Sequence, residues 1–435
     1  MTLSLSEVLE QIGERAAAAS RILAQATTIE KNEALLAIAR RIDQEMQSIL
    51  AANEADLQAG ARSGLSSAML DRARLDPKRI QAIANSVREV VRLADPVGEV
   101  LREWSRPNGL KIAKRRVPIG VIGIIYESRP NVTSDAASLC LKAGNAVILR
   151  GGSEAIRSNM ALAEAVSQGC KDAGLPECSV QLVPSTDRAA VTLMAQLDRY
   201  IHLIIPRGGR SLIEAVTRAA RMPVIKHFDG ICAAYVDRAA DLRMAERIVV
   251  NAKCQRPGVC NAIETMLVHE EVARQFLPGC AAALWERGVE LRGDLLTQEI
   301  LGSKVLQATE EDWRTEYLDL ILAIKTVRSL EEAVDHIETY GSHHSDAIVT
   351  EDPLAAQEFL NQVDSAAVFW NASTRFNDGS EFGFGAEIGI STDRLHARGP
   401  MGLEELTSYK YVVEGTGQIK GEKNSGVAGV TVVTE

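Results

Sequence analysis

The feature that most constrains the fold is a regular alternation between short apolar runs and longer helical stretches, which begins near residue 117. The runs are rich in Val, Ile and Leu. Parallel strands need a crossover of about a dozen residues or more, usually a helix, so this alternation predicts βαβ units. The expected strands are VPIGVIGII (117–125), NAVILRGG (145–152), VQLVPS (180–185), IHLIIPRGG (201–209) and MPVIKHFDG (222–230).

A second series of apolar runs with helical patterns between them predicts a second α/β domain. Its expected strands are AIETMLVH (262–269), LILAIKTV (320–327), SDAIVTED (345–352) and SAAVFWNAS (365–373). Residues up to about Arg92 have helical periodicity, with a break at 60–66, and 99–116 reads as a β-ribbon. The tail from Tyr409 reads as strands that pair with a sheet edge, either within the chain or in a neighbouring subunit.

Composition excludes several classes of protein. The chain has 435 residues, 46% of them hydrophobic, which is enough for two or three globular domains. A net charge of −10 and an aromatic content of 4% argue against a nucleic-acid partner. The N-terminus lacks a signal-peptide pattern, and no apolar run reaches about eighteen residues, so we expect a cytoplasmic protein without a membrane partner. Seven scattered cysteines suit reduced thiols, and their spacing predicts no metal site.

The segment NAKCQRPGVCNAIETMLVH (251–269) contains the most informative pair of cysteines. We expect Cys254 at the end of a helix and Cys260 in a loop formed by Pro257 and Gly258. A nucleophilic thiol needs partial exposure and a lowered pKa, which a loop between elements can supply. The residues alone leave Cys260 as either a nucleophile or a passive thiol, whereas Cys254 is expected to be a bystander.

Two expected strands end in glycine pairs that open onto helices: Gly151 and Gly152, and Gly208 and Gly209. Glycine lets a backbone approach a ligand, and ligands gather at the carboxyl ends of such strands. Neither segment is a G-x-G-x-x-G or Walker loop. Phosphate or ribose binding and simple tight turns are both open for these positions.

Three segments together resemble the aldehyde dehydrogenase superfamily: GNAVILRGGSE, QRPGVCNAIETMLVH and EFGFGAEIGISTDRLHARGPMGLEELTSYKY. Within it the match is to the γ-glutamyl phosphate reductase family, from about Lys111 to Lys420. The resemblance implies an α/β, aldehyde-dehydrogenase-like fold with two doubly wound α/β domains and a small β oligomerisation element. It implies a cofactor-binding domain over 1–225, a catalytic domain over 226–398, and a return to the cofactor domain with oligomerisation strands over 399–435.

The implied reaction is NADPH-dependent reduction of L-γ-glutamyl phosphate to L-glutamate 5-semialdehyde and phosphate, the second step of proline biosynthesis from glutamate. Cys260 takes the place of the superfamily's catalytic thiol, and Ser128 or Asn131 falls near its oxyanion-stabilising asparagine. Competing hypotheses are an acyl-CoA reductase, an oxidising aldehyde dehydrogenase, and a non-catalytic scaffold with a buried Cys260.

The resemblance also places the NADP(H) cofactor. Arg150 stands where a lysine usually contacts the adenine ribose, and Ser153 replaces a glutamate that would repel a 2′-phosphate. Glu316 occupies the position of the nicotinamide-ribose carboxylate, with a solvated glutamate as the alternative. The implied cofactor-binding residues are Arg150, Gly151, Gly152, Ser153, Gly208, Gly209 and Glu316.

The substrate anions and the acyl intermediate raise further expectations. Arg129, Arg256 and Arg398 are the expected substrate-binding cations. His227, in HFDG, replaces the glutamate base of the hydrolytic enzymes, which suits an acyl group exchanged with phosphate; a structural histidine is the alternative. The resemblance further implies a homo-oligomer and a separate glutamate kinase that makes the acyl phosphate, and the sequence leaves open whether the two enzymes associate.

Overall fold

The computed structural model describes residues 3–127 and 129–420. The chain divides into two compact units, each described by itself below. The first unit contains Met1–Gly208, Glu214–Val224 and Gly402–Glu435, and the second contains Gly209–Ile213 and Ile225–Met401. Across the described residues, no helix has the length and apolar character needed to cross a membrane.

The N-terminal part of the first unit is helical, as predicted. Its helices are α1 (Leu5–Leu23), α2 (Thr28–Gln44), α3 (Met46–Arg62), α4 (Ser67–Ala73) and α5 (Pro77–Arg92). Capping boxes begin the first two helices: Ser4 and Thr27 accept the backbone N–H of Glu7 and Glu30, whose carboxylates accept in return. The expected break falls in the turn between α3 and α4.

The first unit is built on a parallel sheet with the strand order β5-β4-β3-β6. Every residue of β3 and β4 is buried, as expected for strands covered on both faces. Strands β4 and β5 lie on one side of β3 and β6 on the other, so the winding direction changes between β3 and β6. The strands are β3 (Val121–Tyr126), β4 (Ala146–Arg150), β5 (Val180–Leu182) and β6 (Leu203–Arg207); the helices are α6 (Asn131–Lys142), α7 (Ile156–Asp172), α8 (Ala189–Met194) and α9 (Arg210–Ala219).

Two strand predictions need correction. The run 117–125 is interrupted at Gly120, whose N–H donates to the side-chain oxygen of Asn145. The segments β2 and β3 are therefore separate strands. The run 222–230 forms one bridge to β6 at Val224 and no strand. Pro223 has no backbone N–H to donate to a neighbouring strand. The Lys226 N–H donates to the Asp393 carboxylate instead of to a strand.

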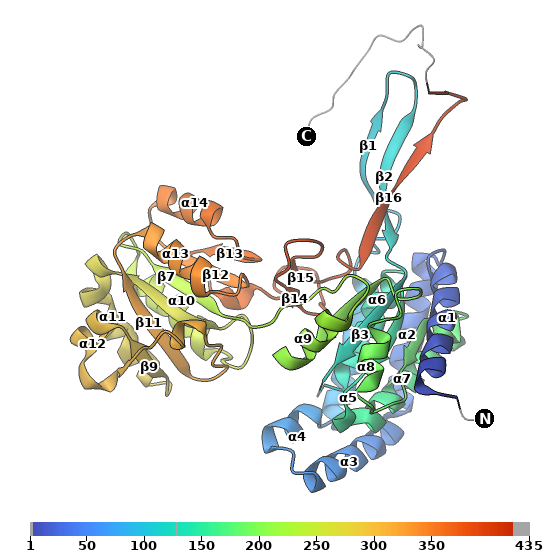
Figure 1. The fold of residues 1–435 in the computed structure, drawn as a ribbon, viewed down its shortest axis with the longest axis horizontal. Helices are drawn as coiled ribbons and strands as arrows, with labels where there is room; N and C mark the ends of the chain where they lie inside the picture. The colour runs from blue at the N-terminus through green and yellow to red at the C-terminus, as the bar shows by residue number, and fades with distance from the viewer. Residues whose placement is uncertain (1–2, 128, 421–435) are drawn as a thin grey trace. The chain divides into compact units, whose positions relative to one another are not determined.

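A three-stranded antiparallel sheet extends from the first unit (Figure 1). It contains β1 (Val100–Ser105), β2 (Lys111–Pro118) and β16 (Thr407–Glu414) in the order β1-β2-β16. The predicted ribbon and a predicted tail strand are therefore confirmed, and the tail strand pairs within its own chain. The rest of the expected tail strands, from residue 421, lies outside the described residues.

The second unit holds a parallel sheet with the strand order β10-β9-β11-β8-β7-β12-β13, which confirms the second α/β domain. Its strands are β7 (Cys232–Val236), β8 (Ile263–His269), β9 (Glu290–Gly293), β10 (Leu306–Gln307), β11 (Ile321–Val327), β12 (Ser345–Val349) and β13 (Ala367–Trp370). Its helices are α10 (Leu242–Cys254), α11 (Glu270–Trp285), α12 (Leu295–Leu301), α13 (Leu330–Tyr340) and α14 (Pro353–Gln362), and a small pair of strands, β14 (Ile390–Ser391) and β15 (Gly399–Pro400), follows.

Helices cover both faces of this sheet. In β7, Ala234 and Val236 pack in the cluster under α10 and α11, whereas Ala233 and Tyr235 pack in the cluster under α13 and α14. This alternation is the period-two pattern of a strand buried on both sides. The central strands are therefore held rigidly, and the loops at their ends have fixed anchor points.

Candidate active site

Three loops of the second unit meet at the amino-terminal edge of its sheet. Gly230 precedes β7, Cys260 precedes β8 and Glu316 precedes β11. These strands are adjacent and parallel in the order β11-β8-β7, so their amino ends lie at one edge. The structure therefore gathers the expected nucleophile and the expected carboxylate at the edge opposite to the one that usually binds ligands in open α/β sheets.

Gly230 joins these two groups through its backbone. Its N–H donates to Glu316 Oε1 at 2.8 Å, and a Cβ at this position would lie 2.5 Å from the Cys260 Cα. Only glycine permits this approach, since the Cβ of any other residue would overlap the backbone of the turn that contains Cys260. Burial raises the pKa of Glu316, and the hydrogen bond from Gly230 opposes this shift.

Cys260 lies in a turn between α10 and β8, as predicted, and is half-buried. The backbone carbonyl of Cys260 accepts the Cys232 thiol at 3.1 Å, and Cys232 itself is fully buried. Burial raises the pKa of Cys232 far above its ordinary value, so it acts as a neutral donor beneath the loop. Partial exposure on a fixed turn is the environment that a nucleophilic thiol requires.

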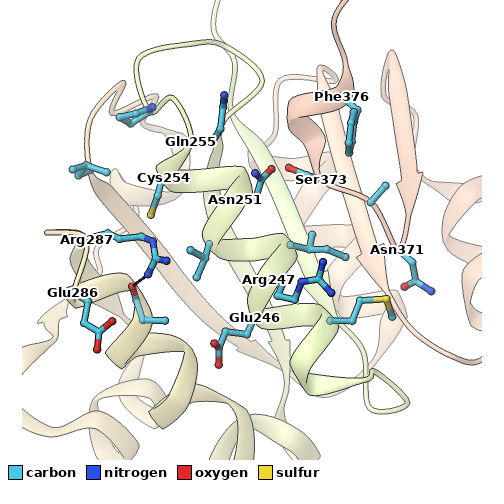
Figure 2. Close-up of a pocket in the computed structure, with 17 residues that line it drawn as sticks. Glu246, Arg247, Asn251, Cys254, Gln255, Glu286, Arg287, Asn371, Ser373 and Phe376 are labelled. Atoms are coloured by element: carbon cyan, nitrogen blue, oxygen red, sulfur yellow. Dashed lines mark hydrogen bonds between the residues drawn. The ribbon is translucent and has the colours of Figure 1, made fainter. Parts of the chain in front are cut away.

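Cys254 ends α10, as predicted, and faces a different space. It lines a groove of about 1230 Å³ along α10, together with Arg247, Asn251 and Arg287 (Figure 2). Cys260 is not among the residues that line this groove. Burial raises the pKa of Cys254, which makes it a poor nucleophile, and all seven cysteines are free thiols.

The turn 226–230 is fixed at both ends. Lys226 forms an ion pair with Asp393 at 2.9 Å, and Asp229 forms one with Arg210 at 2.6 Å. The carboxylate inside HFDG is thus held by an arginine and is not a free base. These contacts, together with the Gly230 hydrogen bond, hold the turn against Cys260.

His227 lies in the same turn and is half-buried. Its ring makes an edge contact with His344, with centroids 5.7 Å apart. His344 is fully buried, and its Nδ1 lies 2.8 Å from the Ser345 hydroxyl and 3.6 Å from the Cys232 sulfur. His227 thus contacts a cluster of polar side chains that includes His344, which in turn lies beside Cys232.

The expected substrate arginines have different surroundings. Arg398 is held by Asp364: its Nη1 donates to the Asp364 carboxylate and its Nη2 to the Asp364 carbonyl, both at 2.6 Å. Arg256 follows α10 and is exposed. The sequence-based selection missed Arg375, whose Nη1 donates to the side chain of Asn261, the residue after Cys260. The only local sign of Arg375 in the sequence is that it is a basic residue in the short polar segment after β13.

The expected oxyanion residues lie in the first unit, at the start of α6. The Asn131 amide donates to the carboxylate of the half-buried Asp135 at 2.8 Å. Burial raises the pKa of Asp135 to about 6. Arg129 is exposed one turn earlier, and its carbonyl accepts the Val132 N–H. Ser128 lies outside the described residues.

The expected cofactor residues follow the carboxyl ends of β4 and β6 in the sheet of the first unit. Arg150 is almost fully buried; its Nη2 donates to the Thr186 and Asp187 carbonyls, while its Nε has no partner among the described residues. Ser153 is exposed, as a ligand contact requires. Gly208 follows β6, and Gly209 falls on the other side of the division between the units.

The protein's own packing requires glycine at 151, whereas at 152 a Cβ would meet only the flexible end of a side chain. A Cβ at Gly151 would lie 2.1 Å from the Asn159 amide nitrogen, and one at Gly152 would lie 2.0 Å from a Glu154 carboxylate oxygen. Glu154 therefore folds over the turn that Ser153 was expected to leave free of negative charge. The serine at 153, considered by itself, did not indicate that the Glu154 carboxylate lies over this turn.

Comparisons with known proteins place the chain in a family. A model of the aldehyde dehydrogenase family matches residues 3–302. A γ-glutamyl phosphate reductase of Moorella thermoacetica is 59% identical over 408 residues, which cover 94% of this chain and 97% of that protein. The chain belongs to the γ-glutamyl phosphate reductases of the aldehyde dehydrogenase family.

Solved structures agree with this family. The γ-glutamyl phosphate reductase of Thermotoga maritima matches with a TM-score of 0.93 and 48% identity, covering 95% of this chain and 99% of that one. An acetylating aldehyde dehydrogenase from Geobacillus thermoglucosidasius matches with a TM-score of 0.70 at 18% identity, which shows the common fold alone. The predicted aldehyde-dehydrogenase-like fold is confirmed.

Proposed function

We infer that the chain is an NADP(H)-dependent γ-glutamyl phosphate reductase, which reduces L-γ-glutamyl phosphate to L-glutamate 5-semialdehyde and phosphate in proline biosynthesis. Two relatives that carry this name are 59% and 55% identical to the chain, and the matches cover 97% and 98% of their own lengths. The observation that carries the proposal at the site is the fixed, half-buried Cys260 turn, with Gly230 and Glu316 behind it.

In the proposed reaction, the Cys260 thiolate attacks the acyl carbon of the substrate. The C–S bond forms, the acyl C–O bond breaks, and phosphate leaves with that electron pair. Backbone N–H groups at the turn and the Asn131 amide would stabilise the tetrahedral oxyanion, each worth about 3 kcal/mol. When bound, the nicotinamide cofactor supplies the hydride that reduces the thioester, and the thiol is released with the aldehyde.

The residues of the turn 226–230 explain why water does not intercept the acyl group. The hydrolytic relatives use a glutamate base in this turn, and His227 takes its place here. The Asp229 carboxylate is held by Arg210. Without a free carboxylate base, attack by water on the thioester is slow and phosphate exchange is favoured.

Family membership implies a nicotinamide cofactor, and the first unit offers groups that fit one. Arg150 brings a buried guanidinium, whose Nε has no partner in the described part of the chain, to the carboxyl end of β4, beside an exposed Ser153. We propose that Arg150, Ser153 and the glycines at 151, 152, 208 and 209 bind the adenosine and phosphate part as NADP(H). Glu316 would bind the nicotinamide ribose.

Three further features of the enzyme are proposed. A separate glutamate kinase supplies the acyl phosphate. The free thiols suit a cytoplasmic location. The chain forms a homo-oligomer through the three-stranded sheet, where Tyr409, Tyr411 and Val413 are exposed beside Trp104, because an exposed apolar face of this kind marks an interaction surface.

The reverse reaction tests the proposed function. Cyclised glutamate 5-semialdehyde is mixed with NADP⁺, and NADPH formation is followed with and without inorganic phosphate. We expect strict phosphate dependence. A requirement for coenzyme A would identify an acyl-CoA reductase, and turnover without either acceptor would identify an oxidising aldehyde dehydrogenase.

A further inference from the structure

We propose that Arg375, with Arg256 beside it, binds an oxyanion of the substrate next to Cys260; this rests on the proposed function. Neither the family match nor the sequence motifs assign a role to Arg375. Its position depends on a short 3₁₀ turn, Thr374–Phe376, that follows β13.

Hydrogen bonds fasten this turn to the residue that follows the nucleophile. The Thr374 hydroxyl donates to the Asn261 carbonyl at 2.7 Å, and the Asn261 amide donates to the Asn377 carbonyl at 3.0 Å. The Arg375 Nη1 donates to Asn261 Oδ1. The guanidinium is therefore held by the side chain of Asn261, the residue that follows Cys260.

The second hydrogen-bond partner of the Arg375 guanidinium is also neutral. Its Nε donates to Gln255 Oε1 at 2.9 Å, and Gln255 comes directly before Arg256. Two neutral amide oxygens fix the direction of the guanidinium without compensating its charge. Among the described residues, no carboxylate forms an ion pair with either Arg375 or Arg256.

Arg256 and Cys260 are both near enough to Arg375 to affect its charge. Burial lowers the pKa of Arg375, and the next largest cause is repulsion from Arg256. The Asp378 carboxylate, a thiolate at Cys260 and the Glu381 carboxylate act in the opposite direction and favour the charged guanidinium. Neither cation has a carboxylate at ion-pair distance among the described residues, and an oxyanion bound between them would offset their repulsion, so this cluster has the character of an anion site.

Other arginines of the second unit show the contrast. Arg394 and Arg398 share the Asp364 carboxylate, and Arg210 pairs with Asp229. These three cations are neutralised within the protein. Arg256 and Arg375, by contrast, form no ion pair with a carboxylate among the described residues.

The substrate offers two oxyanions, an acyl phosphate and an α-carboxylate, and a guanidinium fork fits either. The test therefore varies the two chemistries separately. In the reverse reaction, the carboxylate is carried by the semialdehyde and the phosphate is added as inorganic phosphate. If the KM rises for only one of these two ligands, Arg375 binds the oxyanion that this ligand carries.

The experiment measures the three Michaelis constants of full-length Arg375→Met and Arg375→Lys, with Arg238→Met as an exposed arginine control after β7. We expect Arg375→Met to raise the KM for either semialdehyde or phosphate at least about tenfold. Arg375→Lys keeps the positive charge but loses the forked guanidinium, so its KM for that ligand lies between those of the wild type and Arg375→Met. The KM for NADP⁺ stays within about twofold in all variants, because a site for substrate anions has no part in cofactor binding.

A binding measurement guards against misfolding and loss of turnover. Cys260 is alkylated with iodoacetamide, and inorganic phosphate or glutarate is added as protectant. We expect protection of the wild type by one of the two, and its loss in Arg375→Met. Unchanged substrate KM values, protection that persists in Arg375→Met, or an equal rise in the KM for NADP⁺ would overturn the inference. Wild-type turnover without phosphate would overturn the proposed function instead.

Discussion

The Lys253 ammonium and the Glu264 carboxylate lie 2.5 Å apart, and neither side chain is exposed to solvent. Lys253 is on α10, and Glu264 is on β8, just beyond Cys260. Burial raises the pKa of Glu264 to about 7, and the Lys253 ammonium opposes this shift. The second oxygen of Glu264 accepts the Leu318 N–H at 3.3 Å. The pair thus joins the nucleophile segment to the loop that bears Glu316.

Lys253→Met should lower the free energy of unfolding by about 3–5 kcal/mol, because it leaves Glu264 buried without a counter-charge. Urea unfolding at pH 8 measures this, since the uncompensated carboxyl is most costly when ionised. The double variant Lys253→Met/Glu264→Leu removes both charges and should recover most of the loss. A double variant no more stable than the single one would contradict the ion-pair explanation.

Cys260→Ser should reduce NADPH formation in the reverse reaction by about a thousandfold or more, because the hydroxyl is a far weaker nucleophile than the thiolate. Cys254→Ser should keep activity within about threefold, since Cys254 lies in the groove along α10. Iodoacetamide labelling with mass spectrometry is the companion measurement. Preferential labelling of Cys254 would contradict the assignment.

Gly230→Ala should reduce kcat at least about tenfold, because the new Cβ would displace the backbone of Cys260. Gly279→Ala in α11 is the matched control: its nearest neighbour would be a Glu246 oxygen at 3.5 Å. That change should leave kcat unaffected and raise stability by up to about 1 kcal/mol. Equal kcat in the two variants would show that the contact with Cys260 is unimportant.

His336 should make stability depend on pH. Burial lowers its pKa from 6.5 to about 3, and the Lys325 ammonium, 3.4 Å from its Nδ1, adds to this effect. The unfolded state therefore binds a proton that the folded state refuses between these values. Unfolding free energy should fall by about 1.4 kcal/mol per pH unit as the pH drops below 6.5.

The control for this slope is His336→Phe, which keeps the ring contacts with Trp313 and Tyr340 and cannot be protonated. Urea unfolding at pH 7, 6 and 5 compares the two proteins. The difference in slope between wild type and variant isolates the histidine from all other titrating groups. Parallel curves would show that His336 is protonated in the folded state.

Glu154→Gln should shift the cofactor preference toward NADP⁺. The Glu154 carboxylate lies over the turn at Gly152, where it would oppose a 2′-phosphate held near Arg150. Removal of one partly screened charge is worth about 1 kcal/mol, or about fivefold in the ratio of kcat/KM for NADP⁺ to that for NAD⁺. An unchanged ratio would place the 2′-phosphate elsewhere.

The sequence alone determined the local elements of this protein. Apolar runs such as 145–152 and 262–269 are strands because their composition and length are properties of neighbouring residues, and the position of Cys260 in a turn follows from Pro257 and Gly258. The same local information failed at 222–230, where the side chain of Asp393 takes the Lys226 N–H. A hydrogen-bond partner from so distant a segment leaves no periodic signal.

Only the tertiary structure decided which loops meet. Strand order and register depend on the packing of both sheet faces, so the approach of Gly230 to Cys260 and of Glu316 to Gly230 could not be read from spacing. Arg375 and Asn261 are 114 positions apart in the chain, yet one side chain orients the other. Sequence patterns record what each residue prefers among its neighbours. The site depends on contacts that exist only once distant segments are packed into one core.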